Sequence, residues 1–324
     1  MRLVAAFLSL AIAGCGGGAG AAAVPGTTVS TSTPSSTPSS SPSSATYSCP
    51  SAQTSSGALD CTKLPLGDQK FSTTSAQVGY VYSCQSLSGS PAVASAPWLD
   101  AANGTWNLPA KLAVQGAVSW SGTFAQTISG SSNTITSDEV PVSPHTTGTF
   151  PIAATDPASQ YDRNPNAIAP HAISVTLNAN PTVAAQPTCL RMGAIGITVT
   201  GVAIYNGFDA AGYDAVAREE QDACHGHPDG SETYHYHGIL QACVPDAGSA
   251  TVNSSLLGYA LDGFGIYGPW YDGKILTSAD LDACHGTTSA VMWNGTLVTM
   301  YHYVSTYDFP YTLGCYRGIP VKAL

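Results

Sequence analysis

The stretch that most constrains this chain runs from Cys224 to Cys243 and reads CHGHPDGSETYHYHGILQAC. It contains four of the chain's eight histidines, as two His-x-His pairs on either side of a Pro-Asp-Gly-Ser turn signal. These are His225, His227, His235 and His237. Because side chains alternate along a strand, each pair directs both imidazoles to one side if its segment is extended. The pattern predicts a β-hairpin with histidines on one face.

One hairpin register opposes both pairs at once. Residues that face one another in antiparallel strands have numbers with a constant sum, and His227 with His235 gives the same sum as His225 with His237. Opposed Cβ atoms lie about 5 Å apart. Because neutral imidazole is the commonest metal-binding side chain, the grouping predicts a metal site. The alternative is a packed face of histidine and tyrosine rings with no metal.

The start of the chain has the pattern of an export signal. Arg2 precedes an apolar run, Leu3–Ala13, which is too short to cross a bilayer as a helix of about 20 residues. Ile12-Ala13-Gly14-Cys15 resembles the lipobox of bacterial lipoproteins. That resemblance implies a signal peptide over 1–15, cleavage before Cys15 and lipidation of its thiol. A lipid-anchored protein of the cell envelope is expected, in the outer membrane if the host is Gram-negative, because Gly16 is not the aspartate used for inner-membrane retention.

Residues 16–46 consist almost only of Gly, Ala, Ser, Thr and Pro and carry no charge. Such a segment cannot bury enough apolar surface to order itself, so a disordered tether is predicted. It would hold the folded part of the chain away from the membrane that the lipid on Cys15 binds.

The charge and the cysteine content indicate which class of partner is disfavoured and in which redox compartment the protein resides. The net charge is −10, and Lys and Arg are sparse and unclustered, which argues against a nucleic-acid partner. Eight cysteines remain after Cys15, an even number that favours disulfides in an exported protein. Eight cysteines allow many connectivities, and thiolate metal ligation is a further alternative. Sequence proximity suggests the pairs Cys49–Cys61, Cys224–Cys243 and Cys284–Cys315, which leaves Cys84 to pair with Cys189 across a long loop.

Alternating β-forming segments dominate the rest of the chain. Short runs punctuated by Gly, Ser and Asn occur between 78 and 142, and longer runs occur at 171–177, 190–205, 256–269, 297–304 and 309–316. Helices are expected only over 209–222 and 278–282, the second with Ser278 as its N-cap. The prediction is a mainly β fold, β-sandwich-like or irregular α+β with little helix, stabilised by disulfides. A β-rich N-terminal part (47–188) would precede the core that holds the histidines (189–324).

That core contains an internal repeat. Asp222-Ala223-Cys224-His225-Gly226 recurs as 282–286, Tyr234-His235-Tyr236 recurs as 301–303, and a cysteine closes each copy. In the second copy Thr287 replaces His227 and Val304 replaces His237. The first copy therefore has a metal-competent set by itself. The second copy either repeats only the local structure of the first or supplies the extra ligands His285 and His302.

Several blocks in order resemble the YHYH-domain family over roughly 190–320. They are Gly226-His227-Pro228, Tyr234-His235-Tyr236-His237, the 257–269 block with Asp262-Gly263-Phe264-Gly265, Leu281-Asp282, and the ending Phe309-Pro310-Tyr311 to Cys315-Tyr316-Arg317-Gly318. Members are mostly exported bacterial proteins. The resemblance implies that His227, His235 and His237 are the recurrent histidines. His225 is less general, and the family usually has Asn at the position of His285.

Three functions fit these features. The first is a site for copper or zinc at His227, His235, His237 and His225, with Asp222 or Asp262 as an oxygen ligand or as an orienting partner. The second is a metal-dependent hydrolase or oxidase, although no H-E-x-x-H or G-x-S-x-G motif is present. The third is a surface module that binds a protein or glycan partner without metal. Catalytic residues, the metal and the substrate are not specified by the sequence.

Overall fold

The computed structural model describes residues 47–239 and 243–322. The predicted signal peptide, the lipidation site Cys15 and the predicted tether lie outside these residues. The mainly β prediction is confirmed, because strands dominate and α1 (Ala215–Arg218) is the one α-helix among the described residues. Three short 3-10 helices accompany it, Leu108–Ala110, Pro157–Gln160 and Ser278–Asp280. None of the helices in 47–239 and 243–322 has the length and apolar character to span a bilayer.

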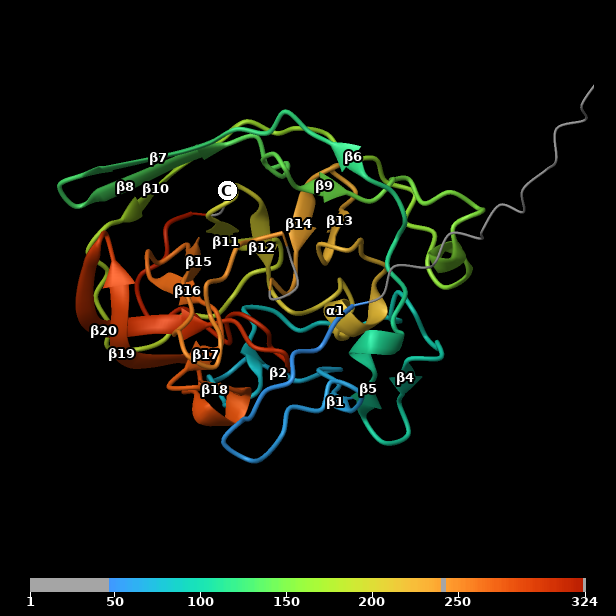
Figure 1. Ribbon diagram of the computed structural model, residues 1–324, viewed down its shortest axis with the longest axis horizontal. Coiled ribbons are helices and arrows are strands. Elements are labelled where there is room, and N and C mark those ends of the chain that lie inside the picture. Colours follow the sequence, from blue (N-terminus) through green and yellow to red (C-terminus); the bar gives the residue numbers. More distant parts are fainter. Residues whose placement is uncertain (1–46, 240–242, 323–324) are drawn as a thin grey trace, which may run out of the picture. The chain divides into compact units, whose positions relative to one another are not determined.

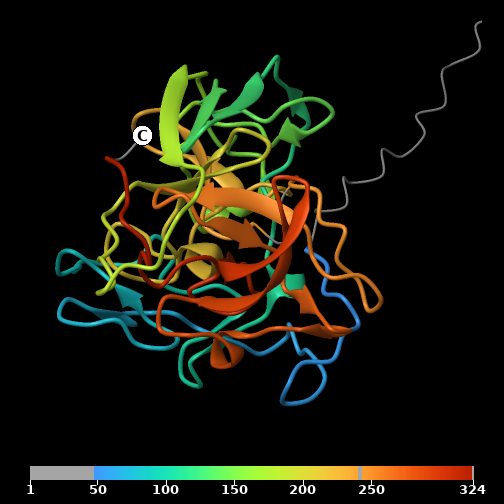
Figure 2. The same ribbon diagram turned by 90° about the vertical axis from the view of Figure 1, so that its left-hand side faces the viewer.

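The largest element is an eight-stranded sheet built from residues 194–304 (Figure 1). Its strands, in spatial order, are β13 (Gly226–Pro228), β14 (Tyr234–Tyr236), β12 (Ala203–Tyr205), β11 (Ala194–Thr198), β15 (Leu256–Ala260), β16 (Gly265–Tyr267), β20 (Thr296–Val304) and β19 (Gly286–Trp293). Figure 2 views the molecule from the side on which the long β19–β20 hairpin lies.

The sheet consists of two equivalent halves that meet where β11 pairs with β15. Each half has an antiparallel hairpin followed by a strand that returns parallel to its second member: β12 pairs with β14, and β16 pairs with β20. Ile204 lies beside Tyr236 in one half and Ile266 lies beside Tyr303 in the other. The sequence repeat is therefore a repeat of the fold, with one cysteine-closed hairpin at each edge of the sheet.

Glycine permits the close approach of the two halves. At the central pair, a Cβ on Gly196 would lie 2.7 Å from the Tyr259 carbonyl oxygen, and one on Gly258 would lie 2.7 Å from the Ile197 carbonyl oxygen. Gly196 and Gly258 occupy equivalent positions in the two halves. Any larger residue at either position would push β11 and β15 apart.

Five smaller sheets complete the described residues. Two have three strands: β1 (Leu64–Pro65), β5 (Thr105–Trp106) and β4 (Leu99–Asp100); and β10 (Ile173–Asn178), β8 (Ser132–Ser137) and β7 (Phe124–Ser129). Three have two strands: β2 (Phe71–Ser72) with β3 (Val81–Tyr82), β6 (Val118–Ser119) with β9 (Thr146–Thr147), and β17 (Trp270–Tyr271) with β18 (Lys274–Ile275). Residues on both sides of position 189 share one hydrophobic core, which includes Trp98, Trp106, Ile197 and Tyr236.

The four cysteine pairs predicted from the sequence are the pairs that the structure brings to bonding distance. They are Cys49–Cys61, Cys84–Cys189, Cys224–Cys243 and Cys284–Cys315. The second joins the N-terminal part to the start of the sheet. The last two tie the ends of the equivalent hairpins.

The predicted helix over 209–222 is wrong in extent, since only Ala215–Arg218 is helical. The Asp209 carboxylate accepts the N–H groups of Ala211 and Tyr213, which holds that segment in a side-chain-closed turn instead of a helix. Asp214 then caps α1 by accepting the Ala217 N–H.

Two smaller predictions also need correction. The short element at Ser278–Asp280 is a 3-10 helix, and its N-cap is Thr277, not Ser278. Residues 309–316 form no strand, because Tyr311 adopts a φ of 67° and the segment turns repeatedly. Its apolar side chains are nevertheless buried.

Candidate metal centre

The histidine hairpin forms with the predicted register. In the β13–β14 pair His227 lies opposite His235 and Pro228 lies opposite Tyr234. Asp229 holds the turn, because its Oδ1 accepts the Ser231 N–H at 2.8 Å and the Thr233 N–H at 3.1 Å. The alternation of β14 therefore places His235 on one face of the sheet and Tyr234 and Tyr236 on the other.

His225 does not join the other three histidines. Strand β13 begins one residue later, and His225 itself has a φ of 60°, in the left-handed region. The Asp222 carboxylate sets this turn by accepting the N–H groups of Cys224 at 2.9 Å and Gly226 at 3.2 Å. The His225 ring consequently turns away and packs against Tyr47, with ring centroids 4.1 Å apart.

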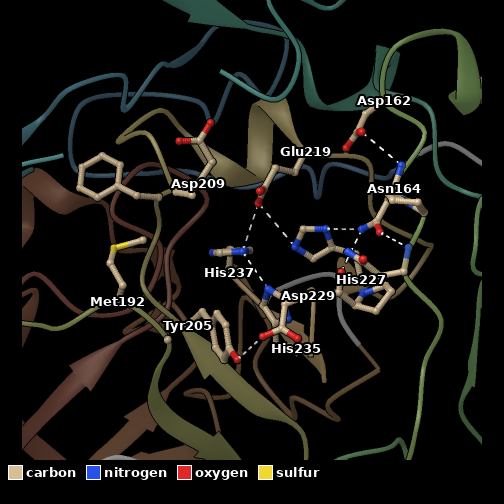
Figure 3. Close-up of a pocket in the computed structure, with 17 residues that line it drawn as sticks. Asp162, Asn164, Met192, Tyr205, Asp209, Glu219, His227, Asp229, His235 and His237 are labelled. Carbon is tan, nitrogen blue, oxygen red and sulfur yellow. Dashed lines mark hydrogen bonds and ion pairs between the residues drawn. The ribbon is translucent and has the colours of Figure 1, made fainter. Parts of the chain in front are cut away.

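The remaining three histidines converge. His227, His235 and His237 each offer a ring nitrogen within 4.8 Å of the others, and all three side chains are buried (Figure 3). Their ring centroids are 4.6 Å apart for His227–His235, 4.9 Å for His235–His237 and 5.4 Å for His227–His237. This triad could hold a metal ion.

Backbone carbonyls fix the tautomers of two members. His235 Nδ1 lies 3.0 Å from the Thr233 carbonyl oxygen, and His237 Nδ1 lies 2.5 Å from the Asn206 carbonyl oxygen. A carbonyl can only accept, so both Nδ1 atoms carry a proton, and in the neutral form of each ring Nε2 presents a lone pair. The two Nε2 atoms are 3.1 Å apart. Two lone pairs at that separation repel unless a proton or a metal ion lies between them.

A carboxylate that the sequence did not predict completes the group. Glu219 is the residue that ends α1, and its Oε2 lies 3.2 Å from His237 Nε2 and 3.4 Å from His227 Nε2 (Figure 3). The Oε2 atom and His227 Nε2 are buried without a hydrogen-bond partner among the described residues. The available signal was the adjacent pair Glu219-Glu220 just upstream of Cys224, in a chain with few charged residues.

Burial keeps the rings of His227 and His235 neutral. Removal from water, with the nearby charge of His237, lowers the pKa of His235 to about 3. The same desolvation, with the charges of His235, His237 and Lys111, lowers the pKa of His227 well below its ordinary value. Neutral imidazole is the form that ligates metals, so both rings are in the ligand state at neutral pH.

The predicted oxygen donors lie on the opposite face of the sheet. Both Asp222 carboxylate oxygens accept the Tyr234 hydroxyl at 2.9 Å, and Asp262 Oδ2 accepts the Tyr303 hydroxyl at 2.5 Å. Burial raises the pKa of Asp222 to about 6 and also raises that of Asp262. Neither carboxylate faces the histidine triad, and both serve as acceptors for buried tyrosines and turn N–H groups.

The second-copy histidines do not reach the triad either. His285 Nε2 lies 2.9 Å from the Thr306 hydroxyl. His302 lies opposite Thr287 on β19 and packs edge-on against Tyr267 with centroids 5.1 Å apart. These contacts repeat the local fold of the first copy without its three convergent histidines.

Three residues support the triad from outside. Tyr205 stacks on His235 with ring centroids 3.8 Å apart and donates its hydroxyl to Asp229 Oδ2 at 2.9 Å. Asn164 donates to the Pro228 carbonyl oxygen at 2.9 Å, beside His227. Asn164 comes from the part of the chain that precedes the sheet. Both this part and the sheet therefore contribute residues to the centre.

The triad opens onto a cavity of about 350 Å³. Its polar wall carries four carboxylates, and its apolar wall includes Met192 and Phe208 (Figure 3). No Lys or Arg lines it among the described residues. The four acids are Asp162, Asp209, Glu219 and Asp229. An ion at the triad would therefore be reachable by a small molecule from one side.

Residues 174–275 match the family model described as YHYH protein. The chain carries a YHYH domain. The triad and Glu219 lie inside the matched segment, whereas β19 and β20 lie beyond it. Comparisons with curated proteins and with solved structures gave no match.

Proposed function

We propose that the YHYH domain binds one transition-metal ion through Nε2 of His227, His235 and His237 and Oε2 of Glu219. The observation that supports this most is that His227 Nε2 and Glu219 Oε2 lie 3.4 Å apart and are both buried without a hydrogen-bond partner among the described residues. A buried arrangement of unpaired acceptors is unfavourable unless a cation satisfies them.

The donor set favours zinc or copper. Three imidazole nitrogens and one carboxylate oxygen suit Zn(II) and Cu(II), whereas Ca²⁺ and Mg²⁺ prefer oxygen ligands. The Nδ1 contacts of His235 and His237 with backbone carbonyls are the outer partners that metal-ligating histidines commonly have. The cysteines of the hairpin are in a disulfide and so are not competing ligands.

The adjoining cavity favours a second candidate, a metal-dependent hydrolase or oxidase. A bound ion facing a cavity of about 350 Å³ would keep a position for water or a small substrate. When bound, the ion would supply Lewis acidity or redox chemistry. The residues of the chain would hold it, exclude bulk water and, through Asp162 or Asp209, accept a proton.

We further propose that the protein is exported and anchored in the cell envelope by a lipid on Cys15. Four disulfides suit an oxidising compartment. Replacing Cys15 with Ser should move the protein from the membrane fraction to the soluble fraction. An unchanged membrane fraction for that variant would reject the lipid anchor.

Elemental analysis tests the metal proposal. The mature protein, produced without a histidine tag in an oxidising compartment, should contain close to one equivalent of zinc or copper after exhaustive dialysis. The His235→Ala, His237→Ala double variant should contain none, whereas a matched His145→Ala, His171→Ala variant should retain it. A metal-free wild type that also gains no thermal stability from added Zn(II) or Cu(II) would reject the proposal.

A further inference from the structure

The second half of the sheet contains a cavity at the place equivalent to the metal centre. Tyr267, His302 and Val304 line it, and they correspond to Tyr205, His235 and His237 of the first half. The cavity measures about 130 Å³. The fold repeat has therefore kept a pocket where the second copy lost its metal ligands.

The lining of this cavity differs in chemistry from that of the first. No charged side chain lines it among the described residues, whereas four carboxylates line the cavity at the triad. Aromatic and aliphatic side chains form most of the wall, with two small polar residues. The aromatic rings are those of Tyr267, Trp270 and Tyr271; the aliphatic and thioether groups come from Leu276, Val291, Met292, Leu297 and Val304; the polar residues are Asn253 and Ser254.

His302 supplies one unpaired polar atom to this apolar cavity. Its side chain is only 3% exposed, and its Nδ1 lies 3.2 Å from the Met300 carbonyl oxygen, so Nδ1 carries the proton. Its Nε2 is then an acceptor, and no hydrogen bond to that atom is found within residues 47–239 and 243–322. This acceptor lies at the wall of the cavity, where a ligand that brings an O–H group could donate to it.

Size and access limit the occupant. A cavity of about 150 Å³ holds a single six-membered ring such as benzene, so the space beside His302 suits one ring. Met292 and Leu297 at the cavity are 56% and 66% exposed, which places its rim at the surface. Binding sites for small molecules typically combine apolar walls with a few placed polar groups.

We propose that this cavity is a second ligand site that binds a neutral, hydroxyl-bearing ring, one pyranose residue of a glycan. The sugar ring would pack on Trp270, and one of its hydroxyl groups would donate to His302 Nε2. An anionic or cationic ligand would find no counter-charge among the described lining residues, so neutral sugars are the class selected. This site does not depend on metal binding at the first one.

Titration of the purified full chain with a panel of neutral methyl pyranosides, followed by ligand-observed NMR and tryptophan fluorescence, tests the proposal. At least one sugar should bind with a dissociation constant of about a millimolar, which is typical of a weak single-ring contact. Trp270→Ala should weaken binding at least about tenfold. Trp120→Ala, which removes another half-buried tryptophan outside the cavity, should leave it unchanged.

Two further variants test whether His302 is the hydrogen-bond acceptor and whether the site is independent of the histidine triad. His302→Leu should abolish binding with a retained melting temperature, because it removes the acceptor and keeps an apolar side chain. His235→Ala with His237→Ala should leave sugar binding intact, because these residues belong to the other half. Failure of every neutral sugar to bind would overturn the proposal. So would binding that survives both Trp270→Ala and His302→Leu, or binding confined to a hydroxyl-free ring such as indole.

Discussion

His227 and His235 lie directly opposite one another on antiparallel strands, and their ring centroids are 4.6 Å apart. Strand pairing holds this distance without any metal, since the register is fixed by the Asp229 turn and by the strand ladder. Preorganisation of this kind reduces the ordering cost of binding an ion. The hairpin is thus built before the ligand arrives.

Glu219→Gln should weaken metal binding by at least about tenfold, because the amide loses the negative charge that faces two Nε2 atoms. Competition titration with a chromophoric chelator measures this change. Glu232→Gln is the matched control, since Glu232 is not among the residues that line the cavity. Equal affinities for wild type and Glu219→Gln would remove Glu219 from the ligand set.

Lys111 should act on the centre as a positioning residue. Its fully buried Nζ donates to the carbonyl oxygens of Val216 at 2.5 Å and Glu219 at 2.7 Å, and so fixes the main chain that carries the Glu219 carboxylate. Lys111→Met, combined with Glu220→Gln to keep the buried charge balanced, should lower metal affinity by about 10- to 100-fold.

A double-mutant cycle checks this role, since coupled residues show non-additive effects. The loss caused by the Lys111→Met, Glu220→Gln pair should nearly vanish in a Glu219→Gln background. An undiminished loss in that background would mean that Lys111 acts on the fold in general.

Metal affinity should fall far less between pH 7 and pH 5 than it would for three exposed histidines. An exposed histidine with a pKa of 6.5 would lose roughly 25-fold in affinity between pH 7 and pH 5, because a proton competes for its nitrogen. Burial and the neighbouring His237 lower the pKa of His235 to about 3, and the pKa of His227 is also lowered, so neither ring carries a proton to displace. Calorimetric titration at several pH values measures this, and a loss of several hundredfold would contradict it.

The same depressed pKa values make the metal-free protein acid-sensitive. The unfolded histidines take up protons below about pH 6.5, whereas buried His235 and His225 do so only near pH 3. Their contribution to stability is therefore fully present above about pH 6.5 and is lost as the pH falls toward 3. Denaturant unfolding should show this decline, and variants with His225→Phe should show less of it.

The Cys224–Cys243 disulfide should stabilise the hairpin that presents the triad. It closes a loop with a sequence separation of 19 residues, for which loop entropy gives about 3 kcal/mol. The Cys224→Ser, Cys243→Ser variant should unfold at lower denaturant concentration and bind metal more weakly. The equivalent variant of Cys284 and Cys315 should lose stability but keep its metal affinity. Equal losses of metal affinity in both variants would contradict the local role.

The sequence could predict the hairpin because its determinants are local. Strand alternation and a turn signal fix which of His227, His235 and His237 share a face, and no long-range information is needed. The position of His225 was not predicted correctly. The Asp222 carboxylate accepts the Cys224 N–H in a turn that holds His225 at a positive φ, outside the strand. The repeated Asp-x-Cys-His-Gly segment is a turn motif, which explains why His285 has the same φ sign, 69°.

Glu219 could not be placed from sequence because its position depends on tertiary contacts. The helix that ends at it is a single turn held by Asp214 and by Lys111, a residue more than one hundred positions earlier. Likewise, the pairing of β11 with β15 makes two halves into one sheet, and a sequence repeat alone does not specify how its copies join. Local patterns therefore predicted the three convergent histidines of one hairpin, and long-range packing added the carboxylate and the cavity.

The most direct test of the metal centre is an anomalous-difference map from crystals grown with Zn(II) or Cu(II). One peak should lie at about 2.0–2.2 Å from Nε2 of His227, His235 and His237 and from Oε2 of Glu219, with His225 and His302 unliganded. The absence of a peak among these atoms, or a stoichiometric peak at other residues, would contradict it.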